Sequence, residues 1–543
     1  MKSEPSALRD FTVDRRVWLL SGVALVIGAG ATLLAVALLR LIALSTNLFY
    51  YHQLSFESVS PAGSALGHWM VAVPVVGGLL VGLMARFGSD KIRGHGIPEA
   101  IEAILLNRAR VDLRIAILKP ISAAIAIGSG GPFGAEGPII MTGGAFGSLI
   151  AQWIRLSDAE RTTLLVAGAA AGMSATFATP VAAILLAVEL LLFEWRPRSL
   201  VPVAIASATA GILRVYVLGS GPLFQMPVIG GMHRVSFAVG ALLLGALVGL
   251  IAAGMSRMMY AFEDLFERLP VHWMWWPALG GLGVGVGGLF FPRGLGVGYD
   301  NIADLLHGSA PIRLIFGILI AKSLMWAFSL GSGTSGGVLA PLLMIGGAVG
   351  ALAGHVAHAS TEAEAFWALI GMGAMLAGSL GVPLTAILFS LEVTHCLPAL
   401  LPLTMGCISA YLVTALIMPR SILTEKLSRR GYHLTREYGV DPLELVIVRQ
   451  LMSPLVETVT EAGDEDSPLP ELFTYADATC RGAAELMATE GVASLPVVDR
   501  STQRISGAIT LQDLLQGRSR AVVRERERLS LFSSRNGGQG EHN

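Results

Sequence analysis

Apolar segments separated by short polar stretches fill most of residues 17–418. They lie at 17–47, 66–87, 113–127, 138–154, 162–195, 200–218, 235–263, 274–291, 311–330, 339–358, 365–392 and 397–418. A helix that crosses the hydrocarbon core of a bilayer needs about 20 apolar residues. Several of these segments are shorter than that, or are interrupted by glycine or proline. The pattern therefore predicts an all-α polytopic membrane domain that contains broken helices.

The composition agrees with a membrane protein. Of the 543 residues, 53% are hydrophobic and only 14% are charged, whereas about a quarter of a soluble domain is charged. The 64 glycines suit close helix packing in lipid. Three scattered cysteines are too few to predict a disulfide framework or a metal site. The net charge of -1 does not indicate a partner.

The two ends of the chain are polar. Arg15 and Arg16 precede the first apolar segment, which lacks the pattern of a cleaved secretory signal. Basic residues favour the cytoplasmic side of a span, so we expect residues 1–16 to be a cytoplasmic N-terminal segment. Residues 521–543 have the composition of a disordered tail.

The apolar region consists of two related halves. GSGGPFGAEGPIIMTGGAFG begins at Gly128 and matches GSGTSGGVLAPLLMIGGAVG, which begins 203 residues later at Gly331. The same offset relates the pairs Lys119–Lys322, Pro180–Pro383 and Glu189–Glu392. We therefore expect repeats at about 17–220 and 235–418. Transporters with inverted-topology repeats place broken helices and their binding site near the bilayer midplane.

Three stretches rich in glycine and proline suit an anion: GHGIP at 94–98, GAEGP at 134–138 and GVLAP at 337–341. The start of a helix leaves about four backbone N–H groups free and carries a partial positive charge. Proline fits the first helical turn, and glycine lets a ligand approach the backbone. Helix starts aimed at one point can bind an anion without a fixed cation. Taken alone, 94–98 is equally compatible with a loop turn.

These motifs resemble those of the CLC family of chloride channels and chloride/proton antiporters, usually written GSGIP, G(K/R)EGP and GxFxP. Their order and spacing match over residues 17 to about 430, which implies a CLC-type transmembrane anion-transport domain at 17–430. The resemblance implies a homodimer in the bilayer, with a pore in each subunit and both termini in the cytoplasm. We expect a bacterial inner membrane protein that carries small anions and binds no nucleic acid. We expect no enzyme, since the chain has no HExxH or GxSxG motif.

The resemblance also assigns a site. The anion-binding residues that it implies are His95, Gly96, Ile97, Ala135, Gly137, Val338 and Leu339. Glu136 matches the gating glutamate of the family. Helix N–H groups that bind an anion also bind a carboxylate, and protonation of the carboxylate frees the path. The alternative is that Glu136 only caps its helix as an acid in the first turn.

The chain departs from the family pattern at three positions. His95 replaces a serine that contacts the central anion, and neutral imidazole both donates and accepts hydrogen bonds. This predicts an altered anion preference, for example for bicarbonate, unless His95 turns away and bonds to the backbone. Leu423 replaces the tyrosine of the inner gate. Leu190 stands where proton-coupled members have a second glutamate, and a leucine cannot carry a proton.

The paired charges of the repeats have a simpler explanation. We expect Glu189 and Glu392 to be structural acids, either paired or at helix ends. Lys119 and Lys322 are expected to bond to carbonyl groups or to set the field of the entrance.

The C-terminal region is predicted to be a small α/β cytoplasmic domain at 431–520. Within it, 448–454 and 478–515 resemble a CBS domain, of which a dimer would supply the second copy. Thr510 and Asp513 match the ribose-contacting pattern of that family, which would make adenine nucleotide a ligand. The alternative is a plain helix start with Thr510 as its N-cap. We expect no other cofactor.

The sequence thus favours transport of chloride, and of bicarbonate or another oxyanion, by exchange or passive flux without obligatory proton coupling. A chloride/proton antiporter and a gated chloride channel are the alternatives. The pattern does not separate these classes, because they differ by small barriers at the gates.

Overall fold

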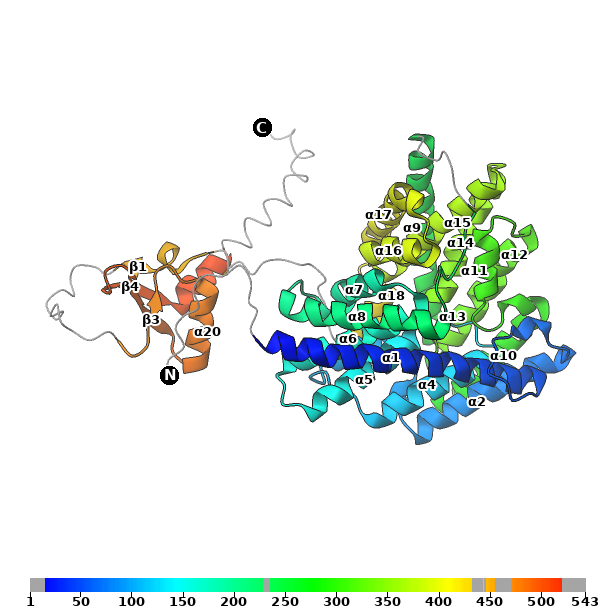
Figure 1. Ribbon diagram of the computed structural model, residues 1–543, viewed down its shortest axis with the longest axis horizontal. Helices are drawn as coiled ribbons and strands as arrows, with labels where there is room; N and C mark the ends of the chain where they lie inside the picture. The colour runs from blue at the N-terminus through cyan, green and yellow to red at the C-terminus, as the bar shows by residue number, and fades with distance from the viewer. Residues whose placement is uncertain (1–14, 228–234, 432–442, 444–445, 455–469, 520–543) are drawn as a thin grey trace, which may run out of the picture. The chain divides into compact units, whose positions relative to one another are not determined.

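The structure is a computed structural model of the chain, shown in Figure 1, and it describes residues 15–227, 235–431, 443, 446–454 and 470–519. Most of the predicted segment 1–16 and the whole predicted tail 521–543 lie outside these residues. The chain forms two compact units, which divide after residue 436. The larger unit is helical, and the smaller one combines helices with a sheet.

The larger unit contains helices from both halves of the sequence. In the first half they are α1 (Arg16–Thr46), α2 (Ala72–Phe87), α3 (Ile97–Leu105), α4 (Leu113–Gly128), α5 (Glu136–Trp153), α6 (Asp158–Phe177), α7 (Pro180–Leu186) and α8 (Pro197–Leu218). In the second half they are α9 (Val235–Glu267), α10 (Trp276–Phe290), α11 (Tyr299–Leu306), α12 (Ile312–Phe316), α13 (Ser323–Gly331), α14 (Leu339–Val356), α15 (Thr361–Leu380), α16 (Pro383–Thr394), α17 (Leu400–Ile417) and α18 (Ile422–Arg429). Short π-helical stretches are η1 (Asn47–Tyr51), η5 (Ala187–Leu192) and η8 (Gly317–Lys322).

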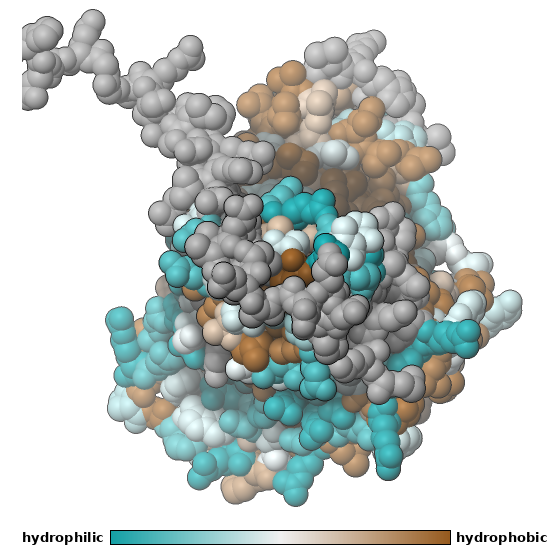
Figure 2. All heavy atoms as spheres, turned by 90° about the vertical axis from the view of Figure 1, so that its left-hand side faces the viewer, coloured by the Kyte–Doolittle hydropathy of each residue, from teal (hydrophilic) through white to brown (hydrophobic). Residues whose placement is uncertain are grey.

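The larger unit has the features of a membrane protein. Within the described ranges, eight helical stretches are long and apolar enough to cross a bilayer. Large apolar side chains are exposed along α17, among them Leu401 at 71% and Leu416 at 77%. Figure 2 shows hydrophobic surface toward the top of its view, the part in which Figure 1 draws α9 and α17. The predicted fold class, a mostly helical protein with several membrane spans, is confirmed.

Two apolar segments that the pattern left undivided, 162–195 and 365–392, each contain a break. α6 ends at Phe177 and α15 at Leu380. The residues that follow them, Ala178 and Gly381, have a left-handed backbone, with φ of 58° and 72°. A proline then begins the next helix in both places. Proline fits the first turn of a helix but not its interior, so each segment becomes two helices.

The two halves pack in the same way. A Cβ atom on Gly143 of α5 would lie 2.3 Å from the carbonyl oxygen of Gly168 in α6. A Cβ atom on Gly346 of α14 would lie 2.3 Å from the carbonyl oxygen of Gly371 in α15. Both pairs are related by the repeat offset of 203 residues. Close contact between backbones therefore requires glycine at the same places in each half.

The smaller unit is a four-stranded sheet with helices, which confirms the predicted small α/β segment. The strands β1 (Ser453–Pro454), β2 (Thr474–Tyr475), β3 (Ser494–Val498) and β4 (Ile505–Thr510) have the order β1-β4-β3-β2. Strands β2 and β3 are parallel, and the other pairs are antiparallel. Helix α20 (Cys480–Glu490) buries Cys480 and Ala483 in an apolar core that also contains Leu495.

Candidate functional site

Three helix starts meet inside the larger unit, as the motifs predict. Helix α5 begins at Glu136, α14 at Leu339 and α3 at Ile97. The loops before α5 and α14 are joined by two hydrogen bonds, because Gly134 N donates to Gly337 O (3.2 Å) and Gly337 N donates to Gly134 O (2.9 Å). The loop before α3 joins the same group through a bridge from Gly94 to Ser335.

Glycine lets these loops touch through their backbones. A Cβ atom on Gly137 would lie 1.8 Å from the carbonyl oxygen of His95, and one on Gly96 would lie 2.5 Å from that of Gly137. Gly94 and Gly96 also have φ of 90° and 92°, values that residues with a side chain rarely adopt. The structure therefore brings the predicted anion-binding residues of all three motifs together. Those with side chains are buried, namely His95, Ile97, Ala135, Val338 and Leu339.

The Glu136 carboxylate lies where α5 and α14 begin. The side chain is fully buried, and a Cβ atom on Gly134 or Gly337 would lie 1.6 or 2.8 Å from its Oε2. The backbone N–H groups of Glu136 and Ala340 lie next to the carboxylate. Neither oxygen makes a hydrogen bond of good geometry with any described residue. Two helix starts thus surround a buried carboxylate, and both favour negative charge.

Two further side chains act on this carboxylate. The hydroxyl of Tyr299, the first residue of α11, lies beside it, and the ammonium of Lys322 acts on it through its charge. Lys322 is fully buried, and its Nζ donates to the carbonyl oxygens of Gly296 (2.9 Å) and Val297 (3.2 Å). The ammonium therefore holds the loop before α11 in place near Glu136.

Lys119, the repeat partner of Lys322, does the same for the loop before α3. Its buried Nζ donates to the carbonyl oxygens of Ile92 (2.8 Å) and Gly94 (2.7 Å). Both lysines thus bond to carbonyl groups, as expected for structural cations. Each holds a loop that leads into a helix start at the candidate site.

Comparison with known proteins decides the family. The family model for voltage-gated chloride channels matches residues 77–415. The chain belongs to this family, the CLC family. Members are channels and transporters, so the expectation that the chain is no enzyme is confirmed.

Relatives of this CLC protein include both functional types by name. The H(+)/Cl(-) exchange transporter ClcA of Vibrio campbellii is 31% identical over 390 residues, which are 68% of this chain and 82% of the relative. The chloride channel protein CLC-f of Arabidopsis thaliana is 32% identical over 372 residues, or 63% of this chain and 46% of the relative. The crystal structure of a slow cyanobacterial Cl-/H+ antiporter is similar in fold, with a TM-score of 0.68 and 22% identity over 77% of this chain and 99% of that one.

His95 stands where the CLC motif has serine, and its side chain is 3% exposed. Its Nδ1 atom has no hydrogen-bond partner in the described part of the chain. The imidazole is surrounded by the charges of Lys426, Glu99 and Lys119. Among the described residues, His95 Nδ1 therefore makes no hydrogen bond to the backbone.

The two leucine departures are buried near α3. Leu423 lies in the first turn of α18, which packs against α3, and Leu190 lies in η5, which also contacts α3. Both side chains are fully buried in the same apolar core as Ile97 and Val338. Neither can exchange a proton or donate a hydrogen bond to an anion.

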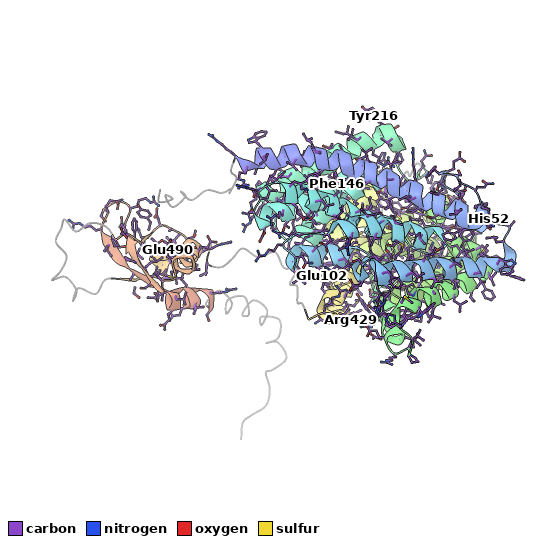
Figure 3. The ribbon with its side chains drawn as sticks, turned by 90° about the horizontal axis from the view of Figure 1, so that it is seen from below. His52, Glu102, Phe146, Tyr216, Arg429 and Glu490 are labelled. Atoms are coloured by element: carbon purple, nitrogen blue, oxygen red, sulfur yellow. The ribbon has the colours of Figure 1, made fainter. Side chains whose placement is uncertain are left out.

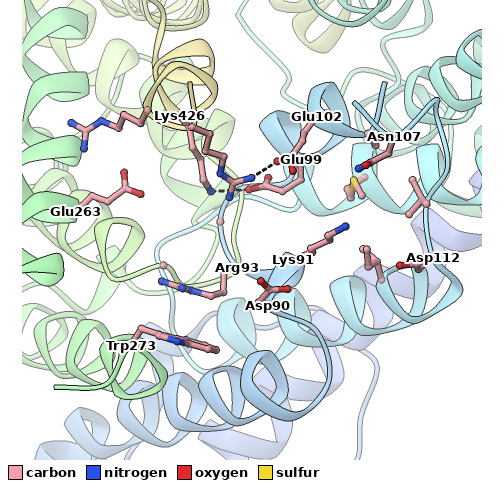
Figure 4. A pocket seen from close by; sticks show the side chains of 18 of the residues that line it. Asp90, Lys91, Arg93, Glu99, Glu102, Asn107, Asp112, Glu263, Trp273 and Lys426 are labelled. Atoms are coloured by element: carbon pink, nitrogen blue, oxygen red, sulfur yellow. Dashed lines mark hydrogen bonds and ion pairs between the residues drawn. The ribbon is translucent and has the colours of Figure 1, made fainter. Parts of the chain in front are cut away.

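A polar cavity opens beside the motif loops. This cavity, which we call the polar vestibule, has a volume of about 750 Å³ and reaches Gly94 and Gly333 of the two loops. Figure 4 shows its charged side chains, with Lys426 bonded to Glu99 (Nζ to Oε1, 2.7 Å). Arg93 lies over the ring of Trp273, 4.7 Å from its centre. The polar vestibule is thus lined by charged side chains and reaches glycines in the loops that precede α3 and α14.

Helix α18 is tied to its neighbours by ion pairs around the polar vestibule. Arg430, just after α18, pairs with Glu102 of α3, and Arg429 pairs with Asp264 of α9. Figure 3 shows Glu102 and Arg429 in the same region of the unit, far from His52. The C-terminal end of α18 is therefore anchored to α3, whereas Leu423 lies at the N-terminal end of α18.

Glu189 and Glu392 cap each other's half. Glu189 accepts from the backbone N–H groups of Leu384 (3.2 Å) and Thr385 (2.8 Å) at the start of α16. Glu392 accepts from those of Val181 (3.0 Å) and Ala182 (2.8 Å) at the start of α7. The acids thus lie at helix ends, as expected. Each acid belongs to one repeat and caps a helix of the other repeat.

Thr510 and Asp513 lie in the smaller unit and form a helix start. Asp513 Oδ2 accepts from Thr510 N (2.9 Å) and Thr510 Oγ1 (2.7 Å), and Thr510 Oγ1 accepts from Asp513 N (3.3 Å). Residues 511–519 are helical. This geometry matches the structural alternative, in which the two side chains satisfy each other.

Sequence reasoning missed Tyr299. The signal was present, because GVG at 296–298 repeats the GHG of 94–96 with an offset of 202 instead of 203. The difference of one residue hides the match when a constant offset is used. In the structure α3 and α11 begin at equivalent places, directly after these glycines.

Proposed function

We propose that this CLC protein transports chloride across a membrane and that Glu136 is its gate. The observation that carries the proposal is the buried Glu136 carboxylate between two helix starts that come from different halves of the chain. Family membership and relatives named chloride channels and chloride exchangers support chloride as the anion.

The gating chemistry follows from charge. Backbone N–H groups at the starts of α5 and α14 favour any small anion, including the Glu136 carboxylate. While it is charged, the carboxylate competes with chloride for this place. A proton removes its charge and its attraction to the helix starts, and the side chain can then leave. We expect the anion to pass from the polar vestibule, which reaches the loops before α3 and α14, toward the N–H groups of Val338 and Leu339.

Two observations favour different answers on proton coupling. Relatives named H(+)/Cl(-) exchange transporters favour a chloride/proton antiporter. Leu190, fully buried where a second glutamate would pass the proton, favours uncoupled flux. The larger body of relatives makes proton-coupled exchange the better supported of the two, with a route for the proton that does not use residue 190.

A second anion is favoured by His95. Its Nδ1 is buried without a partner among the described residues, at the motif whose serine contacts the anion in the family. An imidazole that donates from one nitrogen and accepts at the other matches bicarbonate, which accepts and donates. Chloride can only accept. We therefore propose bicarbonate as an additional substrate.

Purified protein in sealed liposomes tests these proposals. An outward chloride gradient is applied while chloride efflux and internal pH are recorded together. Chloride transport through the proposed gate predicts flux that rises as pH falls and that loses this dependence in Glu136→Gln. Proton movement in a fixed ratio to chloride supports the antiporter, and chloride flux with no proton movement supports the uncoupled alternative. Absence of chloride flux in folded, inserted protein contradicts the proposal.

We propose a regulatory role for the smaller unit and homodimer formation in the bacterial inner membrane. The CBS resemblance of 478–515 supports the first, and the family resemblance supports the second. Removal of residues 437–543 should leave chloride flux intact, which the same liposome assay measures. Because Thr510 and Asp513 bond to each other, ATP should bind the full-length protein only if it displaces this contact. Equal ATP binding by Asp513→Ala would exclude the ribose role.

A further inference from the structure

The start of α11 is the second-half counterpart of the α3 motif. Both helices follow a Gly-x-Gly sequence in which the glycines have positive φ, 90° and 92° at Gly94 and Gly96, and 66° and 79° at Gly296 and Gly298. A buried lysine holds each loop, Lys119 at Gly94 and Lys322 at Gly296. The α3 loop belongs to the anion site, so the α11 loop occupies the equivalent position in the other half.

The side chain that α11 presents there is Tyr299. Its ring is fixed by aromatic contacts, edge-on to Phe177 at 6.4 Å and to Phe224 at 6.0 Å between ring centres. Its hydroxyl is buried and has no hydrogen-bond partner of good geometry among the described residues. A buried hydroxyl without a partner is costly, so a polar group that lies next to it is expected to be its partner.

The Glu136 carboxylate is that partner. It lies beside the Tyr299 hydroxyl, is fully buried, and likewise has no well-formed hydrogen bond to a described residue. The terminal torsion of a glutamate is soft, so the carboxylate can turn to accept from the hydroxyl. We propose that Tyr299 is a positioning residue of the gate, whose hydroxyl donates a hydrogen bond to the Glu136 carboxylate while this carboxylate closes the anion path.

This role fixes the direction of its effect. Besides the backbone, the groups that act on Glu136 are Lys322 of η8 and Tyr299 of α11. A donor to the carboxylate stabilises its charged form and therefore the closed gate. Without the hydroxyl, the carboxylate accepts a proton more readily and the path opens at higher pH. The proposal rests on Glu136 as the gate, but it adds a residue from the second half of the chain.

Tyr299→Phe removes the hydroxyl and keeps the ring. Chloride flux in liposomes should reach its half-maximal rate at a pH about one unit higher than in the wild type, since one pH unit is 1.36 kcal/mol of differential interaction. Flux at alkaline pH should rise. Tyr411→Phe, on the exposed surface of α17, serves as the matched control and should leave the profile unchanged.

The double variant separates this proposal from the proposed function. In Glu136→Gln there is no carboxylate to position, so adding Tyr299→Phe should change the pH profile no further. An unchanged half-maximal pH in Tyr299→Phe overturns the role of Tyr299 while leaving the gate intact. A shift that persists in the Glu136→Gln background shows that the hydroxyl acts elsewhere and also overturns it. Wild-type pH dependence in Glu136→Gln itself would instead overturn the gate.

Discussion

The two halves of the membrane unit have similar backbone arrangements but differ in their side chains. Each half contributes a helix start to the site, a lysine that holds a loop, and glycine contacts between two long helices. At the site, however, the first half places Glu136 where the second places Leu339. The N–H groups of both helix starts favour an anion, but only the first half places a titratable carboxylate there.

The loops before α3 and α11 show the same division. Glu99 ties the first loop through charge, since it accepts from Gly96 N (2.7 Å) and pairs with Lys426. Besides Lys322, the second loop is held by a neutral side chain, because Asn301 donates to the carbonyl oxygen of Arg293 (2.8 Å). The polar vestibule lies beside the first loop and not the second. The similar backbones of the two halves therefore form the site, and their different side chains make its two sides unequal.

The largest effect is expected at the gate. Glu136→Gln removes the titratable charge and keeps the shape, so chloride flux should lose nearly all of its pH dependence in the liposome assay. Glu364→Gln is the matched control, because Glu364 is another buried acid of the membrane unit, on α15. A Glu136→Gln profile that follows the wild type would mean that the asymmetry between the halves does not lie at this residue.

Replacing either buried lysine should lower the free energy of unfolding by a similar amount. Lys119→Met and Lys322→Met each leave two buried carbonyl groups without a donor, and each such group costs about 1–3 kcal/mol. Thermal unfolding in detergent, compared with the exposed Lys91→Met, measures this loss. Only Lys322 acts on Glu136, so among variants that fold, only Lys322→Met should move the pH profile, toward higher pH. Equal profiles would show that the halves are electrostatically alike.

Much of this architecture could be predicted from the sequence, since the repeat with a constant offset reports the backbone. Gly143 and Gly346 make backbone contacts that any side chain would block. Glycine is therefore present at the same place in both repeats and can be recognised in the sequence. Tyr299 could not be found in this way, because one residue of difference in loop length hides its relation to Ile97. The contact of Glu189 with α16 was also hidden, since a residue that caps a distant helix leaves no local signal.

A smaller effect is expected at His95. His95→Ser replaces a group that donates and accepts with the residue of the family motif, and should shift transport toward chloride and away from bicarbonate. A hydrogen bond to a charged group contributes roughly 1.5–3 kcal/mol, and 1.4 kcal/mol is about tenfold, so the flux ratio should change about tenfold or more. Chloride-driven and bicarbonate-driven fluxes at two pH values measure it. Unchanged ratios would show that the imidazole does not face the anion.

The smallest effect is expected where the halves are most alike. Glu189→Ala and Glu392→Ala each remove a carboxylate that accepts from two backbone N–H groups at a helix start, which costs about 0.5–2 kcal/mol. Glu189 also accepts from Thr385 Oγ1 (2.6 Å), whereas the equivalent Ala182 has no hydroxyl. Glu189→Ala should therefore lower the unfolding temperature more than Glu392→Ala.

Thr385→Ala isolates that difference. It should reproduce the excess cost of Glu189→Ala over Glu392→Ala, and in the Glu189→Ala background it should add little, since the hydroxyl has lost its acceptor. None of these variants should change the ratio of protons to chloride if both acids are structural. A proton ratio that falls in Glu189→Ala but not in Glu392→Ala would assign the proton route to Glu189, next to Leu190, and would make this pair unequal in function despite its matched geometry.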